Sequence, residues 1–212
     1  MKKYILLLAL LLSSTTFAVE PKFNDNFKQT KNEIETSSPG KIEVLELFWY
    51  GCIHCYSMDP YLDKWADSLP DDVVFKRVPA IPRKSWVPGA KAYYALETLG
   101  LEGKLHEKLF DAIHKEKSVD PNNEAALISW VTLNGKLDEK EVKAAFNSFS
   151  IDTKLKKSYK IFKEAGATGV PTIIIDGNYM TSSTMAGGEK NAIDITNYII
   201  ENIRNDRKKT SE

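Results

Sequence analysis

Apolar residues along the chain form two kinds of pattern, which predict strands and helices in turn. Residues 41–49 are apolar at most positions, and apolar side chains fall on both faces of the extended segment. Such a run is typical of a central strand that helices cover on both sides. Further strands are predicted over residues 73–78 and 172–175. Asp176-Gly177 then predicts a tight hairpin turn into a return strand over residues 179–181.

One charged residue interrupts the apolar face of the first strand. Glu46 falls on the face formed by Ile42, Val44 and Phe48. Its carboxylate is either partly buried there or extended to solvent, and the pattern alone leaves both alternatives open.

Apolar residues at three- and four-residue steps predict helices in the rest of the chain. The first runs from Cys52 to about Ser68, and Pro60 inside it predicts a kink. From about Ser85 to Ala165 the pattern is helical throughout. Helices are expected there over residues 90–99, 104–114, 121–133, 138–146 and 153–165.

Local signals mark two of these helix ends. Asp120 is a good N-cap because Pro121 follows it at the first helical position. Gly166 is the expected C-cap that ends the helical block. The other segments are expected to form an irregular arm with one short edge strand (19–40), a loop (185–188), a final amphipathic helix (191–203) and a solvated basic tail (204–209).

The first residues predict an export signal. Lys2 and Lys3 form a basic start, residues 5–12 are an apolar core, and residues 16–18 form a plausible cleavage site. The mature chain would then begin at Val19. The alternative is an uncleaved anchor, but the apolar core is far shorter than the ~20 residues that a membrane span needs. The pattern is typical of bacteria, so we expect the periplasm, where disulfides persist.

Charge and cysteine content exclude several classes of protein. Lys and Arg number 29 and Asp and Glu also number 29, so the formal net charge is zero and nothing indicates nucleic-acid binding. The chain has 2 cysteines, too few for a fold held by disulfides, so a hydrophobic core must hold it. We expect residues 1–18 to be a signal peptide, residues 19–84 and 167–212 to form one unit, and residues 85–166 to be inserted in it.

Both cysteines lie in Cys52-Ile53-His54-Cys55, at the junction of a predicted strand and helix. The two sulfurs are one helical turn apart and can bond to each other. Unpaired N–H groups at the helix start favour a Cys52 thiolate, and a protonated His54 adds to this effect. A stabilised thiolate makes the disulfide oxidising. This arrangement predicts a redox-active pair in an α/β thioredoxin-like fold with an inserted all-helical domain.

Three alternative roles for the two cysteines stay open. The first is a zinc site, which needs about four ligands, and the chain has no second Cys-x-x-Cys. The second is a structural disulfide, which would close too small a loop to stabilise the fold much. The third is a pair of inert buried thiols. His106 and His114 lie on a predicted surface helix, where we expect them to be solvated. No metal, flavin or nucleotide motif is visible, so no cofactor is expected.

Four motifs together resemble the DsbA family of bacterial periplasmic thiol:disulfide oxidoreductases. The resemblance covers roughly residues 27–203 and includes the helical insertion. The motifs are Val44-Leu45-Glu46-Leu47-Phe48, Cys52-Ile53-His54-Cys55, Phe146-Asn147-Ser148-Phe149 and Gly169-Val170-Pro171-Thr172.

The resemblance implies roles for several site residues. Pro171 corresponds to the family's cis-proline, which faces the redox pair, and Val170 would offer backbone hydrogen bonds to a substrate peptide. Glu46 corresponds to the family's buried acid near the site. Lys76 resembles its charged partner on the adjacent strand, and Arg77 is a weaker candidate because it is expected on the opposite face.

The resemblance also implies a reaction and its partners. The chain would act as a monomeric dithiol oxidase of exported proteins, and a DsbB-type membrane quinone reductase would reoxidise it. The family's best-known motif has Pro at the position of Ile53, which puts the redox potential in question, while His54 is retained. A disulfide isomerase or reductase and a non-catalytic thioredoxin-fold binding module remain as alternative functions.

Overall fold

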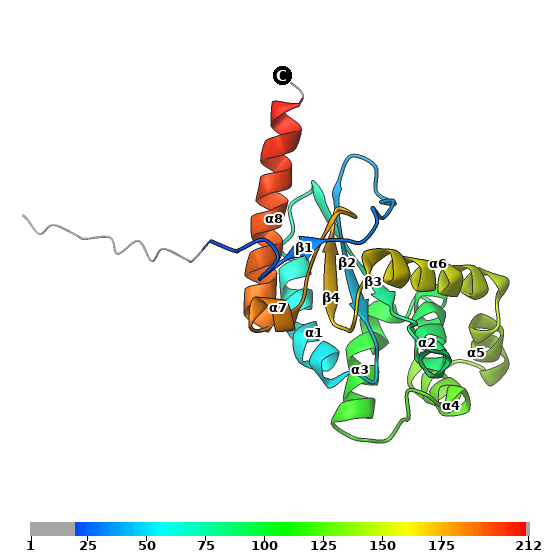
Figure 1. Cartoon of the computed structure of the whole chain (residues 1–212). Helices are drawn as coiled ribbons and strands as arrows, with labels where there is room; N and C mark the ends of the chain where they lie inside the picture. The colour runs from blue at the N-terminus through cyan, green and yellow to red at the C-terminus, as the bar shows by residue number, and fades with distance from the viewer. Residues whose placement is uncertain (1–19, 211–212) are drawn as a thin grey trace, which may run out of the picture.

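A five-stranded mixed sheet with helices on both faces forms the centre of the molecule (Figure 1). The computed structural model describes residues 20–210, so the expected signal peptide at 1–18 lies outside the described residues. The strand order is β1-β5-β4-β2-β3, in which only the β2–β3 pair is parallel. The strands are β1 (Lys28–Gln29), β2 (Ile42–Phe48), β3 (Val73–Pro79), β4 (Thr172–Ile175) and β5 (Tyr179–Thr181).

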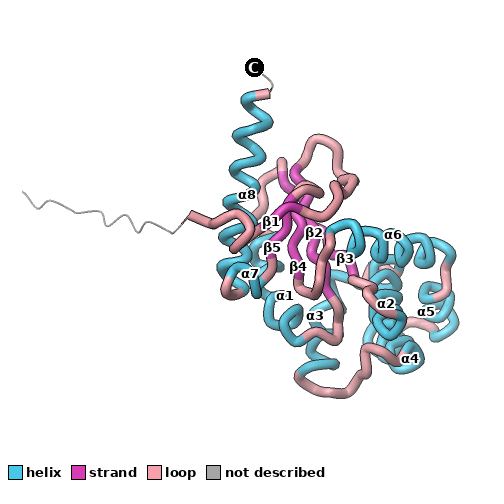
Figure 2. The backbone as a smooth tube through the Cα atoms, in the orientation of Figure 1, coloured by secondary structure: helices cyan, strands magenta, loops and turns pink. Residues whose placement is uncertain are grey.

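Helices α2 to α6 form a block at one end of the sheet, beyond β3 (Figure 2). In sequence this block lies between β3 and β4, so the thioredoxin-like fold with a helical insertion is confirmed. The helices are α1 (Ile53–Ala66), the 3-10 turn η1 (Lys84–Trp86), α2 (Val87–Thr98), α3 (Glu102–His114), α4 (Glu124–Gly135), α5 (Glu139–Phe146), α6 (Phe149–Ala165), α7 (Ser183–Ala186) and α8 (Glu189–Lys209). Within residues 20–210, no helix is both long and apolar enough to span a bilayer.

Strand β2 is central, and all seven of its residues are buried. On one face, Ile42 and Val44 pack in a hydrophobic cluster with residues of α1 and α8. On the other face, Leu45 and Leu47 pack in a second cluster with Ile161 of α6. The prediction of a strand covered by helices on both faces is confirmed.

The hairpin between β4 and β5 follows the predicted turn. Asp176 and Gly177 both have positive φ, at 50° and 70°, and the N–H of Asn178 donates to the carbonyl of Ile175. A Cβ at Gly177 would lie 2.0 Å from the carbonyl oxygen of Ile34. Glycine is therefore required both by the backbone conformation and by the close approach of the N-terminal arm.

The start of α4 differs from the prediction. This helix begins at Glu124, where the side chain of Asn123 accepts a hydrogen bond from the N–H of Ala126 at 3.1 Å. Asp120 instead accepts from the N–H of Asn122 at 2.9 Å and forms a turn before the helix. The predicted N-cap at Asp120 was wrong because Asp and Asn residues close together compete for the same role.

Two other segments are more helical than predicted. Helix α6 begins at Phe149 rather than at residue 153, and it ends as predicted at Gly166, whose φ is 66°. Part of the expected loop at 185–188 belongs to α7, which begins after its N-cap Ser182.

The expected solvated tail at 204–209 is the last part of α8. There Arg204 pairs with Asp72, with Nε 2.6 Å from Oδ2, and Arg207 pairs with Asp176 at 2.7 Å. The prediction of a tail was wrong because these carboxylates come from distant loops, and cations near a helix C-terminus are also favoured by its dipole.

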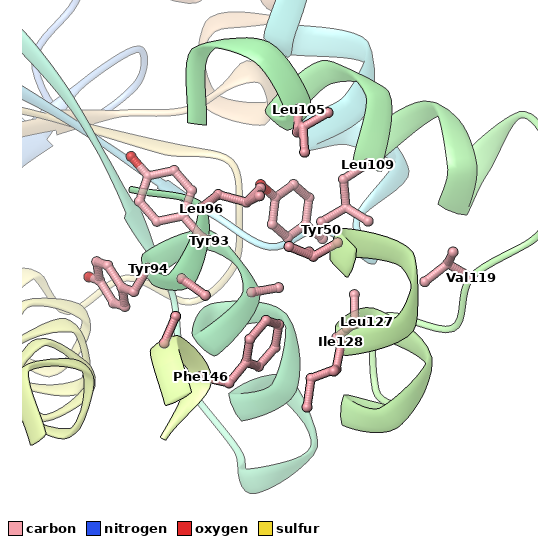
Figure 3. Close-up of a cluster of buried hydrophobic side chains, with 14 of the residues drawn as sticks. Tyr50, Tyr93, Tyr94, Leu96, Leu105, Leu109, Val119, Leu127, Ile128 and Phe146 are labelled. Atoms are coloured by element: carbon pink, nitrogen blue, oxygen red, sulfur yellow. The ribbon is translucent and has the colours of Figure 1, made fainter. Parts of the chain in front are cut away.

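The helical block has a hydrophobic cluster of its own (Figure 3). It includes Leu96 of α2, Leu109 of α3 and Phe146 of α5. Tyr50, from the loop after β2, lies in the same cluster and is only 1% exposed. The insertion therefore packs directly against the segment that leads to Cys52.

Candidate redox site

The two cysteines lie at the start of α1, where their surroundings differ sharply. Cys52 is the N-cap residue, with extended backbone angles, and is partly exposed. Cys55 lies inside the first turn and is fully buried. Both thiols are free in this structure. An incoming nucleophile can therefore reach Cys52 far more easily than Cys55.

Electrostatics separates the two thiols further. A hydrogen bond from the Cys55 thiol is the largest of the effects that lower the pKa of Cys52 to about 6. Backbone N–H groups of His54 and Cys55 and the charge of His54 also lower it, while burial opposes them. Burial is the main reason that the pKa of Cys55 lies well above its usual value. Cys52 is thus the thiolate of the pair at neutral pH.

The loop before β4 lies opposite Cys52. The Val170–Pro171 peptide bond is cis, so the isomer implied by the family resemblance is present. Sγ of Cys52 lies 3.4 Å from the carbonyl oxygen of Val170, to which the protonated thiol donates. Thr172 supports the loop because its hydroxyl donates to the carbonyl of Gly169 at 2.9 Å.

Glu46 is buried close to the two cysteines and is only 1% exposed. Burial is the main cause that raises the pKa of Glu46 to about 8, and the charges of Asp59 and Asp63 act in the same direction. Arg77 opposes them. Oε2 of Glu46 lies 3.3 Å from Nε of Arg77. The charge of Glu46 in turn contributes to the raised pKa of Cys55.

The prediction that Lys76 is the partner of Glu46 was wrong. Lys76 pairs with Glu43, with Nζ 2.7 Å from Oε2. The parallel register places Arg77 beside Glu46 and Lys76 beside Leu45, so Lys76 lies on the other face of the sheet. Arg77, considered the weaker candidate, occupies the expected position.

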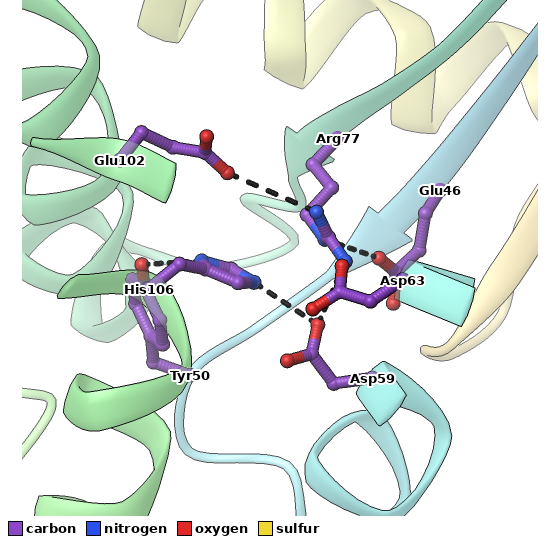
Figure 4. A network of polar contacts seen from close by, with 7 residues as sticks. All are labelled: Glu46, Tyr50, Asp59, Asp63, Arg77, Glu102 and His106. Atoms are coloured by element: carbon purple, nitrogen blue, oxygen red, sulfur yellow. Dashed lines mark hydrogen bonds and ion pairs between the residues drawn. The ribbon is translucent and has the colours of Figure 1, made fainter. Parts of the chain in front are cut away.

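Arg77 is the centre of a partly buried network of charges (Figure 4). Besides Glu46, its guanidinium pairs with Asp59 at 3.0 Å, with Asp63, and with Glu102 at 3.8 Å. Asp59 also bonds to His106 at 3.2 Å. Asp59 was not among the residues predicted from the sequence.

The prediction that His106 and His114 are solvated was wrong. His106 is 4% exposed, and its Nδ1 lies 2.7 Å from the Tyr50 hydroxyl. His114 is partly buried, and its Nε2 bonds to the Tyr50 carbonyl at 2.7 Å. The four-residue spacing of His106, Phe110 and His114 was the available signal, because it places both histidines on the face of the buried Phe110.

The described part of the chain contains no group of three or more His, Cys, Asp or Glu residues placed to hold a metal ion.

Comparisons with known proteins agree on one family. The model of the DSBA-like thioredoxin domain matches residues 77–192. The thiol:disulfide interchange protein DsbA of Azotobacter vinelandii is 35% identical over 86% of this chain and 85% of its own length. The DsbA of Pseudomonas aeruginosa is 34% identical, over 97% of this chain and 99% of its own.

Solved structures give the same result. The crystal structure of Pseudomonas aeruginosa DsbA is similar with a TM-score of 0.80 at 34% identity, covering 89% of this chain and 97% of that one. The oxidoreductase DsbA from Xylella fastidiosa has a TM-score of 0.81 at 28% identity, covering 87% and 98%.

Proposed function

The chain belongs to the DsbA family of thiol:disulfide oxidoreductases, and we propose that it introduces disulfide bonds into exported proteins in the periplasm. The observation that carries this proposal is the contrast between the Cys52 thiol, with a pKa lowered to about 6, and the buried Cys55 thiol. A stabilised Cys52 thiolate favours the reduced enzyme and so makes its disulfide a strong oxidant.

The reaction begins with a disulfide between Cys52 and Cys55. A substrate thiolate attacks the accessible Sγ of Cys52, the bond to Cys55 breaks, and Cys55 leaves with the electron pair. A second substrate thiolate attacks the substrate sulfur of this mixed disulfide and releases Cys52 as a thiolate. Two electrons thus pass to the enzyme, and the substrate leaves with a new disulfide.

Glu46 supplies a proton when Cys55 leaves. The high pKa of Cys55 means that its sulfur is protonated soon after the bond breaks. Because the pKa of Glu46 is about 8, its carboxyl group is mostly protonated at neutral pH and can donate, directly or through water. Arg77 modulates this acid; Lys76 has no part in the step because it pairs with Glu43.

The substrate binds as an extended peptide beside the cis-proline loop. The backbone of Val170, next to Pro171, offers hydrogen bonds to such a peptide in the manner of a short added strand. Ile53, which is 53% exposed, adds an apolar surface beside Cys52. An apolar and tolerant surface of this kind suits many different clients.

The cellular setting completes the proposal. The mature chain starts at Val19 after removal of the signal peptide and works as a monomer. A DsbB-type membrane quinone reductase restores the Cys52–Cys55 disulfide after each cycle.

The test is oxidation of a reduced, unfolded protein with two cysteines by the purified mature chain, followed as loss of free thiols. Wild type should oxidise it stoichiometrically, and Cys52→Ser should abolish the reaction because the attacked sulfur is gone. Given the oxidised form of the same substrate, Cys55→Ser should instead accumulate a mixed disulfide, because the Cys52 thiolate attacks the substrate disulfide, one substrate thiolate leaves, and no Cys55 thiol is present to resolve the bond; non-reducing electrophoresis detects it. Oxidation by Cys52→Ser at the wild-type rate would reject the mechanism.

The direction of the reaction needs a second measurement, the redox equilibrium with glutathione. A potential above roughly −180 mV is expected for an oxidant. A value near or below about −250 mV would indicate a reductase or a structural pair instead.

A further inference from the structure

Two histidines of the helical insertion hold one residue of the redox segment. His106 and His114 lie on the same face of α3, and both bond to Tyr50. His106 contacts the hydroxyl group of Tyr50 and His114 contacts its carbonyl oxygen, each at 2.7 Å. Tyr50 comes two residues before Cys52. Side chain and backbone of this residue are thus fixed from a single helix, and Figure 4 shows the His106 side of this contact.

The chemistry of the partners fixes the donors. A carbonyl oxygen only accepts, so Nε2 of His114 must carry the hydrogen. The Asp59 carboxylate also only accepts, so Nε2 of His106 donates to it, and Nδ1 bonds to the Tyr50 hydroxyl. Every polar contact between the two rings and Tyr50 or Asp59 is then satisfied.

The same helix contacts the other side of the Cys-x-x-Cys motif. The ring of His114 stacks on Tyr56, with centroids 5.1 Å apart and planes at 13°. The Tyr56 hydroxyl donates to Asp111 of α3 at 2.7 Å. Tyr56 directly follows Cys55, and its N–H donates to the Cys52 carbonyl at 3.1 Å. His114 therefore touches the chain both before and after the two cysteines.

The turn before Cys52 needs such support. Helix α1 has no side-chain hydrogen bond at its N-cap, and the Cys52 N–H instead closes a turn on the Trp49 carbonyl at 2.9 Å. One side of this turn is held by the stacked rings of Trp49 and Trp86, 4.1 Å apart. The helical block holds the turn through Tyr50, because Tyr50 lies in the hydrophobic cluster of that block.

We propose that His106 and His114 are positioning residues, which hold Tyr50 and thereby place Sγ of Cys52 over the first N–H groups of α1. Those N–H groups belong to His54 and Cys55 and stabilise the Cys52 thiolate. The helical insertion thus sets the redox equilibrium of the pair through Tyr50. This inference rests on the proposed function, since it concerns the thiolate on which that function depends.

Two substitutions of His114 separate its hydrogen bond from its ring. His114→Phe keeps a ring to stack on Tyr56 but removes the donor to the Tyr50 carbonyl. His114→Gln restores an N–H donor near the position of Nε2 and removes the ring. We would measure the equilibrium constant of each reduced protein with oxidised glutathione, and the pH profile of Cys52 thiolate absorbance at about 240 nm.

We expect His114→Phe to destabilise the reduced form relative to the oxidised form by roughly 2- to 10-fold, the worth of one hydrogen bond in an equilibrium constant. Its thiolate profile should move to higher pH by a corresponding amount. His114→Gln should stay closer to wild type in both measurements. Tyr50→Phe removes only the hydroxyl partner of His106, so it should shift both in the same direction, and it serves as the second variant if His114→Phe folds poorly.

Val142→Ala is the matched control. Val142 is fully buried in the same cluster but lies on α5, so this change should lower stability and leave the redox equilibrium and thiolate profile unchanged. Wild-type values in both His114→Phe and Tyr50→Phe, or an equal shift in Val142→Ala, would overturn the inference. Failure of the wild-type protein to oxidise a substrate would overturn the proposed function instead.

Discussion

Two glutamates on strand β2 have almost no exposed surface, yet their pKa values shift in opposite directions. Glu43 and Glu46 are 2% and 1% exposed and lie on opposite faces of the sheet. Burial raises the pKa of both carboxyl groups, but contacts with Lys76 and two serines bring that of Glu43 below its ordinary value. The pKa of Glu46 rises to about 8. Burial alone therefore does not decide the charge of an acid in this sheet.

The hydrogen-bond donors around each carboxyl group, together with the deeper burial of Glu46, decide the direction of the shift. Glu43 accepts hydrogen bonds from the backbone N–H of Ser37, from the hydroxyls of Ser37 and Ser38, and from Lys76. Among the described residues, Oε2 of Glu46 is a buried atom without a hydrogen-bond partner, although Arg77 lies 3.3 Å away.

Competition for Arg77 widens the difference. This one cation also pairs with Asp59, Asp63 and Glu102, whereas Lys76 pairs with Glu43 alone among the residues that the structure describes. On one face of β2, the carboxylate of Glu43 has its hydrogen bonds satisfied and serves as a structural contact. The face that carries Glu46 keeps a carboxyl group able to hold and release a proton near Cys55.

The largest expected effect comes from removing the two cations. Arg77→Met leaves the buried carboxylate of Asp59 without its arginine partner, and Asp63 loses the same partner, so we expect a loss of about 3–5 kcal/mol in the free energy of unfolding. Lys76→Met should cost no more than about 1 kcal/mol, because its side chain is 38% exposed and the serines still bond to Glu43. Urea unfolding at pH 7 measures both.

Equal losses in the two variants would contradict the comparison. Arg77→Lys sharpens it, since a lysine keeps the charge but lacks the planar fork that reaches several carboxylates at once. We expect its stability to fall between those of wild type and Arg77→Met.

The next effect concerns the pH dependence of stability. The folded pKa of Glu46, about 8, lies above its ordinary value of 4.5, so the folded state holds a proton that the unfolded state releases. Below pH 4.5 the carboxyl group is protonated in both states, and its burial costs no ionisation. The free energy of unfolding then falls as the pH rises from 4.5 to about 8.

Glu46→Gln should remove this loss. At pH 8 we expect it to be more stable than wild type by about 2–4 kcal/mol, and the difference should vanish below about pH 4. The same variant should slow the release of Cys55, because the amide cannot donate a proton as the carboxyl does. A stability difference that does not change with pH would show that Glu46 is ionised in the folded state.

The two faces of β2 also show which features could be predicted from the sequence. The redox motif, the central strand and the hairpin turn were predictable because each depends on a short local pattern, whereas the cis-proline was expected only from the family resemblance. The partner of Glu46 was not, because it depends on the register of two strands. A shift of one residue in the predicted register of β3 exchanges the sheet faces on which Lys76 and Arg77 lie.

Long-range polar contacts were the other missing information. His106 was expected in solvent because its helix was interpreted as a surface helix, and its buried partners Tyr50 and Asp59 lie far from it in the sequence. Arg204 was assigned to a tail for the same reason, since Asp72 lies far from it in the sequence. A local sequence pattern does not identify such distant partners.

The last expected effect tests the Glu43 side of the comparison. Its folded pKa lies below 4.5, so its stabilising contribution is present above that pH and is lost as the pH falls. Glu43→Gln should therefore cost about 1–2 kcal/mol at pH 7, the worth of hydrogen bonds to a charged group, and nothing at low pH. This is the opposite sign and the opposite pH range from Glu46→Gln. Because Glu43 faces away from the thiols, its variant should also leave the glutathione equilibrium of Cys52 and Cys55 unchanged. A shift in that equilibrium would mean that the two faces of β2 are coupled through the strand itself.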